Sequence, residues 1–224
     1  MRIIQLIDSL EAGGAERMAV NYANALSRKG NFSALVATRQ QGPLLIKIDS
    51  DVKYLFLNKK SAIDLKAVYK LRKFARLHKI EFIHAHSTSL YFAVMLKFIY
   101  PQIKIIWHDH YGNSEFLSER PSFMLRTALR FCDLVIAVNT KLENWIRLEL
   151  GFKNTLYLPN FPLLDTTKPE TVLKGSDNFR IICLANLREQ KNHLLLLKVM
   201  ARLKNTHPQW TLHLIGKDFM DEYS

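Results

Sequence analysis

Hydrophobic and polar positions along the chain follow two patterns that alternate. Short apolar runs, typical of buried strands, are each followed by a longer stretch whose apolar residues recur at helical spacing. The first such pair is RIIQLI and the segment 15–29, in which Met18, Tyr22, Ala25 and Leu26 have that spacing. Strands that alternate with helices predict a parallel sheet covered by helices on both faces.

The alternation continues through the first two thirds of the chain. The further strands that it predicts are FSALVAT, VKYLFL, IEFIHAH, IKIIWHDH and DLVIAV. The further helices that it predicts span 64–78, 90–100, 121–131 and 141–150. Pro121 is expected in the first turn of its helix, a favoured position, and Gly151 after the last one. Ligands of such sheets bind beyond the carboxyl ends of the strands, so the loops there are the candidate site.

The pattern is interrupted by NFPLLDTTKPETVLKGSDN, which is rich in proline, threonine and polar residues. We interpret residues 161–178 as an interdomain linker that joins a domain at 1–160 to a second one at 179–224. In the second, FRIICLANL, KNHLLLLKVMARLKN and WTLHLIG predict a strand, a helix and a strand. Because two strands and one helix cannot bury a core alone, we expect an incomplete second domain.

Composition narrows the classes of protein. The 224 residues are 48% hydrophobic and 23% charged, which is typical of a soluble globular protein with a real core. The formal net charge of +12 favours an anionic partner, such as nucleic acid, a phospholipid surface or a phosphorylated substrate. The sequence shows no helix-turn-helix, aromatic RNA-binding platform or zinc finger, so we expect no nucleic-acid partner.

Compartment and membrane contact are predicted from three features. Cys132 and Cys183 lack metal-like spacing and are expected to be reduced and buried. The N-terminus does not resemble a signal peptide, and the run LYFAVML is far shorter than the roughly 20 residues of a membrane span. We therefore expect a cytoplasmic protein, with peripheral association at the inner face of the membrane as a further hypothesis.

That hypothesis depends on the helix predicted at 64–78. One of its faces is apolar and the other carries four basic residues, which is typical of a solvated outer face or of a surface that rests on anionic lipid. The apolar face consists of Leu65, Val68, Leu71 and Phe74, and the basic face of Lys66, Lys70, Lys73 and Arg76.

The stretch EAGGAER follows the first strand and leads into the first helix. Gly13 and Gly14 precede the helix N-terminus, where free N–H groups and the helix dipole favour an anion. Glu16 lies in the first turn, and we expect it to line the pocket at this edge. A tight turn without a ligand is the alternative. The dinucleotide fingerprint GxGxxG is missing, so a nicotinamide enzyme is not expected.

Histidines end two of the predicted strands. His84 and His86 end one strand, and His108 and His110 end another. If these strands are neighbours, all four side chains share one face of the ligand edge, whereas Asp109 faces away. Histidine with Asp109 could bind zinc, but we expect the five residues to line a pocket without a metal.

The segment NLREQKNH of the second domain contains two cations. Arg188 and Lys191 follow a strand and precede a helix, which suits a pyrophosphate. The alternative is a solvated basic turn.

Together these segments resemble the family-4 retaining glycosyltransferases of the GT-B fold, in which two Rossmann-like domains face each other. The resemblance implies an α/β protein with a doubly wound parallel-sheet domain and the start of a second Rossmann-like domain. It covers the whole chain in order and spacing. The segments that carry it are GGAERMAVNYANAL, FIHAHS, IIWHDH, DLVIAVN, LYLPN and LANLREQKNHLLLLKVMARLKNTHPQWTLHLIG.

The resemblance implies a role for each matching residue. Gly13 and Gly14 match the loop that lies against the sugar and diphosphate of the donor. His108 matches the histidine that contacts the donor sugar near the reacting carbon and is the candidate catalytic residue. Lys191 matches the lysine that neutralises the leaving diphosphate, and Arg188 stands near the family's arginine, shifted along the chain. The family's two donor-binding glutamates have no counterpart here.

The function implied is transfer of a sugar, a hexose in our expectation, from a nucleotide-sugar donor with retention. The acceptor expected is lipid-linked or a polysaccharide or lipopolysaccharide of the cell envelope. No cofactor or metal is expected, because Arg188 and Lys191 would take the role of a divalent ion. The alternative is a truncated, non-catalytic half that binds acceptor and needs a partner or is inactive alone.

Overall fold

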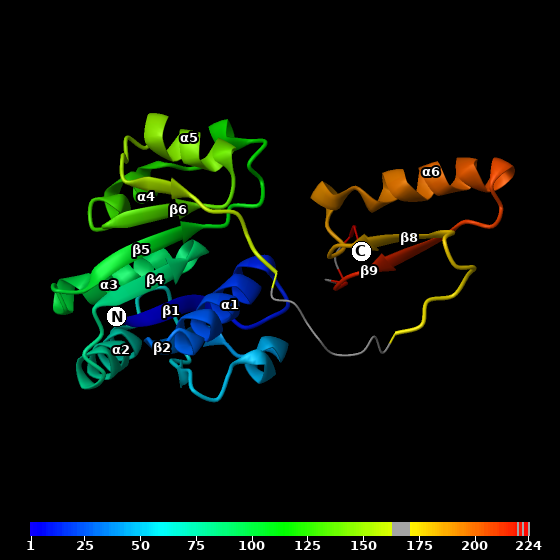
Figure 1. Cartoon of the computed structure of the whole chain (residues 1–224). Helices are drawn as coiled ribbons and strands as arrows, with labels where there is room; N and C mark the ends of the chain where they lie inside the picture. The colour runs from blue at the N-terminus through cyan, green and yellow to red at the C-terminus, as the bar shows by residue number, and fades with distance from the viewer. Residues whose placement is uncertain (163–170, 219, 221, 224) are drawn as a thin grey trace. The chain divides into compact units, whose positions relative to one another are not determined.

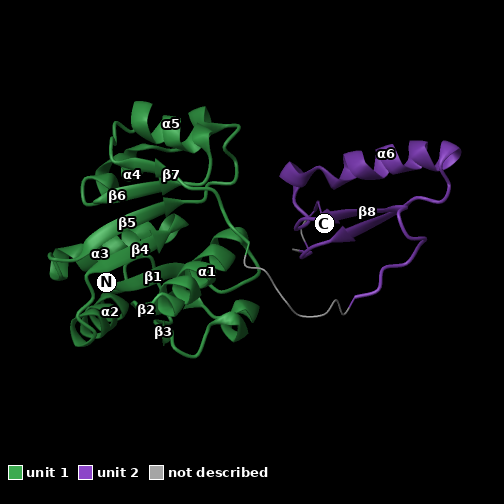
Figure 2. Cartoon of the chain, viewed as in Figure 1, with its two compact units in different colours: residues 1–163 green, residues 164–224 purple. Residues whose placement is uncertain are grey.

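The computed structural model describes residues 1–162, 171–218, 220, 222 and 223. The chain forms two compact units, Met1–Leu163 and Leu164–Ser224 (Figure 2). Residues 163–170 of the predicted linker lie outside the described residues. No helix in the described ranges is both long and apolar enough to cross a bilayer.

Unit 1 is built on a seven-stranded parallel sheet with the order β3-β2-β1-β4-β5-β6-β7 (Figure 1). The chain winds outward from β1 in one direction and then from β4 in the other, which confirms the doubly wound sheet expected from the alternating pattern. One strand, β7, was not predicted. The strands are β1 (Arg2–Ser9), β2 (Phe32–Gln40), β3 (Lys53–Phe56), β4 (Phe82–His86), β5 (Lys104–Asp109), β6 (Leu134–Ala137) and β7 (Thr155–Tyr157).

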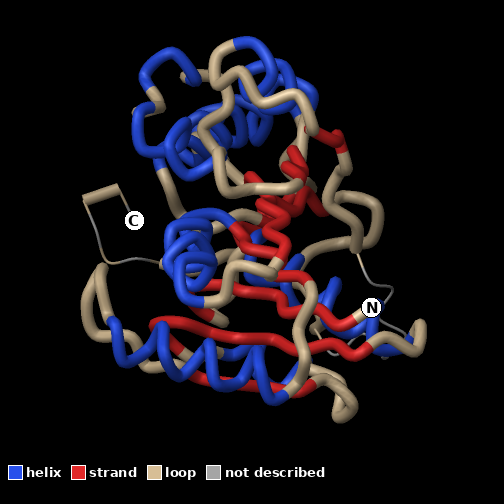
Figure 3. Tube along the Cα trace, turned by 90° about the vertical axis from the view of Figure 1, so that its left-hand side faces the viewer, coloured by secondary structure: helices blue, strands red, loops and turns tan. Residues whose placement is uncertain are grey.

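Helices cover both faces of this sheet (Figure 3). One face is covered over β1 and β2 by α1 and η1, and the opposite face by α2 to α5, whose apolar side chains form the larger core. The α-helices are α1 (Gly14–Arg28), α2 (Leu65–Leu77), α3 (Leu90–Ile99), α4 (Phe123–Leu129) and α5 (Thr140–Leu148). The 3-10 helices are η1 (Pro43–Lys47), η2 (Ser87–Ser89) and η3 (Leu117–Glu119).

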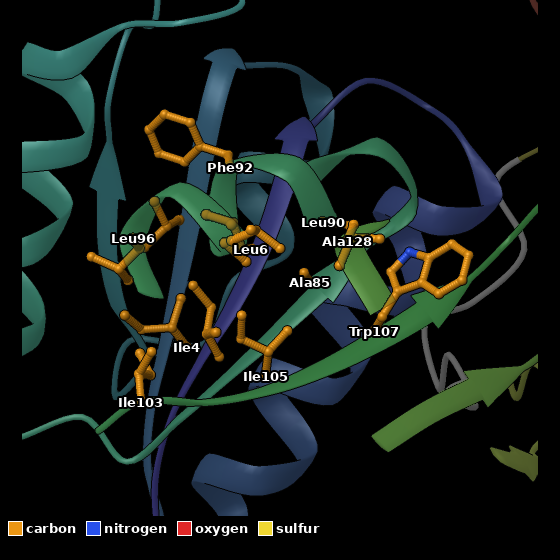
Figure 4. Close-up of a cluster of buried hydrophobic side chains, with 14 of the residues drawn as sticks. Ile4, Leu6, Ala85, Leu90, Phe92, Leu96, Ile103, Ile105, Trp107 and Ala128 are labelled. Carbon is orange, nitrogen blue, oxygen red and sulfur yellow. The ribbon is translucent and has the colours of Figure 1, made fainter. Parts of the chain in front are cut away.

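The larger core lies between the sheet and α3 and α4 (Figure 4). Ile4, Leu6 and Ile105 project from the strands toward Leu90 of α3, and all four are fully buried. Trp107, near the carboxyl end of β5, is also buried, and its Nε1 donates a hydrogen bond to the Ser87 carbonyl oxygen at 2.9 Å. This packing fixes the end of β5 at the candidate site.

Local signals set several helix ends. The Asp64 carboxylate accepts from Ala67 N–H at 3.0 Å and caps α2, and Asn139 caps α5 by accepting from Leu142 N–H at 2.9 Å. Gly151, with φ of 70°, follows α5, as predicted.

Two local expectations, on Pro121 and on the cysteines, were wrong, and one residue of the predicted apolar helix face, Leu65, is exposed. Pro121 precedes the Ser122 cap of α4 and is not in the first turn, because the helix starts later than its apolar pattern suggested. Leu65 is 72% exposed because it begins α2, away from the core that buries Val68. Both cysteines are free but half-buried rather than buried.

Unit 2 contains a parallel pair of strands, β8 (Arg180–Leu184) and β9 (Thr211–Ile215), joined through η4 (Glu189–Lys191) and α6 (His193–Thr206). Apolar side chains of all three larger elements remain exposed, including Leu184 at 80% and Leu194 at 55%. The strand–helix–strand pattern was predicted, and its exposed apolar surface agrees with the expectation that so small a unit cannot bury a core alone.

Candidate functional site

The histidines that end β4 and β5 come together in one cluster. His86 pairs with His108 in the register of the two strands. The rings of His84 and His108 are nearly parallel, with centroids 5.2 Å apart, and the His108 and His110 centroids are 4.0 Å apart. The expected gathering of the four side chains on one face is therefore confirmed.

Two residues that the sequence did not single out complete this histidine cluster. His86 Nε2 donates to Gln5 Oε1 of β1 at 2.9 Å, which leaves His86 Nδ1 to accept from His110 Nε2 at 3.0 Å. Tyr22 of α1 lies over the cluster, with its ring centroid 5.0 Å from that of His84. In the sequence, Gln5 and Tyr22 cannot be distinguished from ordinary residues of a buried strand and a helix. Their contact with the histidines could therefore not be predicted.

Burial keeps the cluster neutral. It lowers the pKa of His84 to about 3 and that of His110 to about 4, and holds those of His86 and His108 well below the ordinary value. Among the described residues, His84 Nε2, His110 Nδ1 and both ring nitrogens of His108 have no hydrogen-bond partner. The cluster therefore contains uncharged, buried imidazoles whose unpaired nitrogens a polar ligand that reaches them would satisfy.

The cluster also contains residue types that bind metals. One nitrogen each of His84, His86 and His108 lies within 4.8 Å of the others. Asp109, considered above as a further ligand, projects to the opposite face of the sheet, as the alternation of strand residues predicted. The residues that could hold a cation are thus the imidazoles alone.

The glycine turn lies at the same edge of the sheet. Gly13 caps α1 in an extended conformation, with φ of −139°, and its N–H donates to Glu11 O at 2.9 Å. Its φ requires no glycine, and a Cβ on Gly14 would meet open space. Glu16 accepts a hydrogen bond from Ser9 Oγ at 3.3 Å. At Gly13 a Cβ would collide with the carboxylate of Glu16, so the packing of that side chain is one reason for glycine there. At Gly14 the reason that remains is room for close approach to the backbone.

Another glycine, Gly42, supports this turn and was missed. A Cβ at Gly42 would collide with the backbone of Leu10 and Glu11, just before the turn. Leu44 N–H donates to Leu10 O at 3.1 Å in the same place. Close packing of two loops leaves no pattern in sequence, so Gly42 could not be recognised there.

On the opposite face, the end of β5 carries a buried ion pair. Arg120 Nη1 and Nη2 donate to Asp109 Oδ2 and Oδ1 at 2.6 and 3.0 Å, and Tyr111 N–H donates to Oδ1 at 3.1 Å. The Arg120 guanidinium lies 4.1 Å from the centroid of the Tyr111 ring and 4.8 Å from that of Trp145. Burial raises the pKa of Asp109, and Arg120 counteracts this.

A cavity of about 400 Å³ opens beside this ion pair at the carboxyl ends of β4 and β5. We call it the aromatic pocket, because Tyr91, Trp107 and Tyr111 contribute to its wall. Its lining consists of Ser87, Thr88, Tyr91, Trp107, Asp109, His110, Tyr111, Gly112, Arg120, Pro121 and Leu125. His110 thus belongs to both the histidine cluster and the pocket.

In unit 2, Arg188 and Lys191 are exposed in the turn between β8 and α6. The sequence predicted this position after a strand and before a helix. Arg188 precedes η4 and Lys191 ends it. The first amide of α6, His193 N–H, donates to Tyr223 Oη at 2.8 Å. Since this amide already has a partner, the two cationic side chains are the candidates for contact with an anion in this turn.

Comparison with known proteins gives three kinds of match. The family model of Glycosyltransferase Family 4 matches residues 12–161. An uncharacterised glycosyltransferase of Haemophilus influenzae is 24% identical over 221 residues, which cover 94% of this chain and 60% of that protein. The chain therefore spans less than two thirds of this relative.

Two solved structures show the fold that the chain shares. Anabaena HepE in complex with UDP and glucose superposes with a TM-score of 0.70 at 19% identity, over 96% of this chain and 60% of that one. Sucrose-phosphate synthase of Thermosynechococcus elongatus gives 0.67 at 14% identity, over 100% and 65%. At these identities the likeness establishes the architecture, which is the GT-B type.

Proposed function

Because the chain belongs to glycosyltransferase family 4, we propose that it transfers a sugar from a nucleotide-sugar donor to an acceptor hydroxyl, with retention at the anomeric carbon. The observation that carries the proposal is the juxtaposition of the glycine turn and the neutral histidine cluster at the ligand edge of unit 1. HepE, whose structure holds UDP and glucose, supports a nucleotide sugar as donor.

In this proposal His108 contacts the donor sugar. A neutral imidazole can accept from or donate to a sugar hydroxyl without placing a second positive charge beside the developing oxocarbenium-like ring. Both ring nitrogens of His108 have no partner among the described residues, so they can form new hydrogen bonds. The backbone at Gly14 approaches the donor closely, because a Cβ direction there meets open space.

Arg188 and Lys191 are proposed to bind the diphosphate. Negative charge grows on the diphosphate as its bond to the sugar breaks, and two cations stabilise that charge. On this mechanism the transfer needs no metal ion.

Membrane contact is a further part of the proposal. Lys66, Lys70, Lys73 and Arg76 of α2 are all exposed, as the helical pattern predicted, and the chain has a net charge of +12. A cationic helix face is attracted to anionic lipid. We therefore propose a lipid-linked or envelope-glycan acceptor at the inner face of the membrane, where a cytoplasmic enzyme meets it. A vesicle flotation assay tests the membrane contact. We expect the protein to float with vesicles of anionic phosphatidylglycerol but not with vesicles of phosphatidylcholine.

We propose to test the 224-residue chain in two steps. Titration calorimetry measures the binding of UDP and UDP-glucose, and an assay of UDP release then measures turnover. We expect binding that is weakened by Lys191→Ala and unchanged by Lys198→Ala, which removes an exposed lysine from α6. Equal binding by both variants would show that Lys191 does not contact the diphosphate.

The second candidate is a non-catalytic half that binds acceptor only. The chain covers 60% of the length of the H. influenzae relative, so the activity of the chain alone has to be measured. Failure to bind or turn over any of UDP-glucose, UDP-galactose and GDP-mannose would support it over the first.

A further inference from the structure

The aromatic pocket is separate from the residues assigned above to the donor. Its volume of about 400 Å³ falls within the range of small-ligand sites, roughly 300–1,000 Å³. Aromatic side chains from three places in the sequence, Tyr91 of α3, Trp107 of β5 and Tyr111 of the following loop, contribute to one wall. A cavity with flat apolar faces and a few polar groups suits a compact ligand with both kinds of surface.

The charges of the pocket cancel within it. The side chains of Asp109 and Arg120 are 1% and 10% exposed and are joined by two hydrogen bonds. Each charge is therefore already compensated, and neither a phosphate nor a cation would gain a free partner there. The ligand that fits is uncharged.

Polar groups remain at the rim. Ser87 and Thr88 contribute hydroxyls, of which Thr88 Oγ1 already donates to Asp8 Oδ2 at 2.5 Å. His110 contributes a neutral ring whose Nδ1 is buried and has no partner among the described residues. Since His110 Nε2 donates to His86, its Nδ1 carries a lone pair that can accept from a hydroxyl. Ser87 has φ of 51°, a strained conformation for serine that is held by the Trp107 hydrogen bond to its carbonyl.

The position of the pocket connects it to the reaction. His110 lines the pocket, and its ring is stacked at 4.0 Å on that of His108, the residue proposed to contact the donor sugar. A ligand in the pocket would thus lie one side chain away from the transferred group. The acceptor is the substrate that needs this position.

We propose that the aromatic pocket binds a neutral pyranose ring of the acceptor. This proposal rests on the proposed function. Tyr91 and Tyr111 pack against the C–H face of the ring, His110 accepts from one of its hydroxyls, and Arg120 is a positioning residue that holds Tyr111 and Asp109. The acceptor is accordingly a saccharide at its reacting end, and any lipid lies further along it.

Ligand-observed NMR on the full chain without donor tests the proposal. The probes are the methyl glycosides of glucose, galactose, mannose and N-acetylglucosamine, with geraniol as a lipid alcohol. At least one glycoside should bind with a dissociation constant in the millimolar range, on the order expected for a single ring. Tyr111→Leu should weaken this binding about tenfold, the effect of losing one aromatic contact.

Tyr69→Leu is the matched control, because Tyr69 is 62% exposed on α2 and lies outside the pocket. This variant should bind the glycoside as tightly as the parent protein does. Thermal unfolding checks that each variant folds, and Tyr91→Leu replaces Tyr111→Leu if that variant does not. The probes are tested up to about 20 mM, well above a millimolar dissociation constant. The proposal is overturned if no glycoside binds or if geraniol alone binds. It is also overturned if the folded pocket variant binds the glycoside like the parent. Titration with UDP-glucose is independent of these results, so it separates failure of the pocket from failure of the proposed function.

Discussion

Replacing Arg120 by methionine should destabilise unit 1 severely. The variant leaves the Asp109 carboxylate, which is 1% exposed, with one donor among the described residues, the Tyr111 N–H, in place of three. Removing one partner of a buried ion pair costs about 3–5 kcal/mol, because the other charge stays buried without compensation. For a unit of this size that corresponds to a fall in melting temperature of about 6–20 °C.

The loss should depend on pH with a defined sign. Burial raises the pKa of Asp109 in the folded protein, and Arg120 opposes the rise, so Arg120→Met raises that pKa further. Between the unfolded value, about 3.9, and the raised folded value, the folded state binds more protons than the unfolded state. Stability of the variant therefore falls as pH rises through this window, and the gap to the parent narrows as pH is lowered toward 4.

Urea denaturation at pH 7 and pH 4.5, followed by hydrogen exchange of the β5 amides, measures both effects. Arg126→Met, which removes an exposed arginine of α4, is the control and should shift stability little. Asp109→Asn in the Arg120→Met background should restore part of the loss, because the unpaired charge is gone. A loss under about 1 kcal/mol, or one that does not change with pH, would refute the account of a buried, charge-compensated pair.

Further outcomes are expected for glycine, lysine and histidine variants and for chelation. Gly42→Ala should lower the melting temperature, since its Cβ collides with the backbone of Leu10, whereas Gly14→Ala meets open space and should keep stability but weaken UDP-glucose binding in calorimetry. Lys191→Ala should reduce sugar transfer about 30-fold, or about 2 kcal/mol of transition-state stabilisation; a change within twofold would contradict its role. His108→Ala should lower turnover more than it weakens nucleotide binding, as steady-state kinetics can show. Chelation by EDTA should leave the rate of transfer unchanged, and loss of activity that zinc restores would reveal a metal at the histidine cluster.

The fold could be predicted because the strand and the helix of each βα repeat have different spacings of apolar residues. The strand at RIIQLI and the helix after it differ in apolar period, and their order alone implies parallel pairing. The register of His86 and His108 follows from the crossover through α3, since consecutive strands so joined lie side by side. β7 escaped notice because Thr155–Tyr157 is too short to show a period.

The candidate site was predictable only where a residue stands at a strand end. Four histidines could be recognised from this position: His84, His86, His108 and His110. Arg120 lies in a loop between the predicted elements, and only its folded path brings it to Asp109. Loop conformation and long-range pairing are decided by tertiary contacts, which local pattern does not record.

The end of β5 explains why the two sites of unit 1 differ. Successive strand residues face opposite sides of a sheet, so His108 and Asp109, one residue apart, serve opposite faces. On the α1 face burial keeps the imidazoles neutral, and on the other face Arg120 cancels the carboxylate. Neither the imidazoles nor the Asp109–Arg120 pair can then neutralise a leaving diphosphate, which requires other cations. The proposal that Arg188 and Lys191 supply them follows from their position after β8.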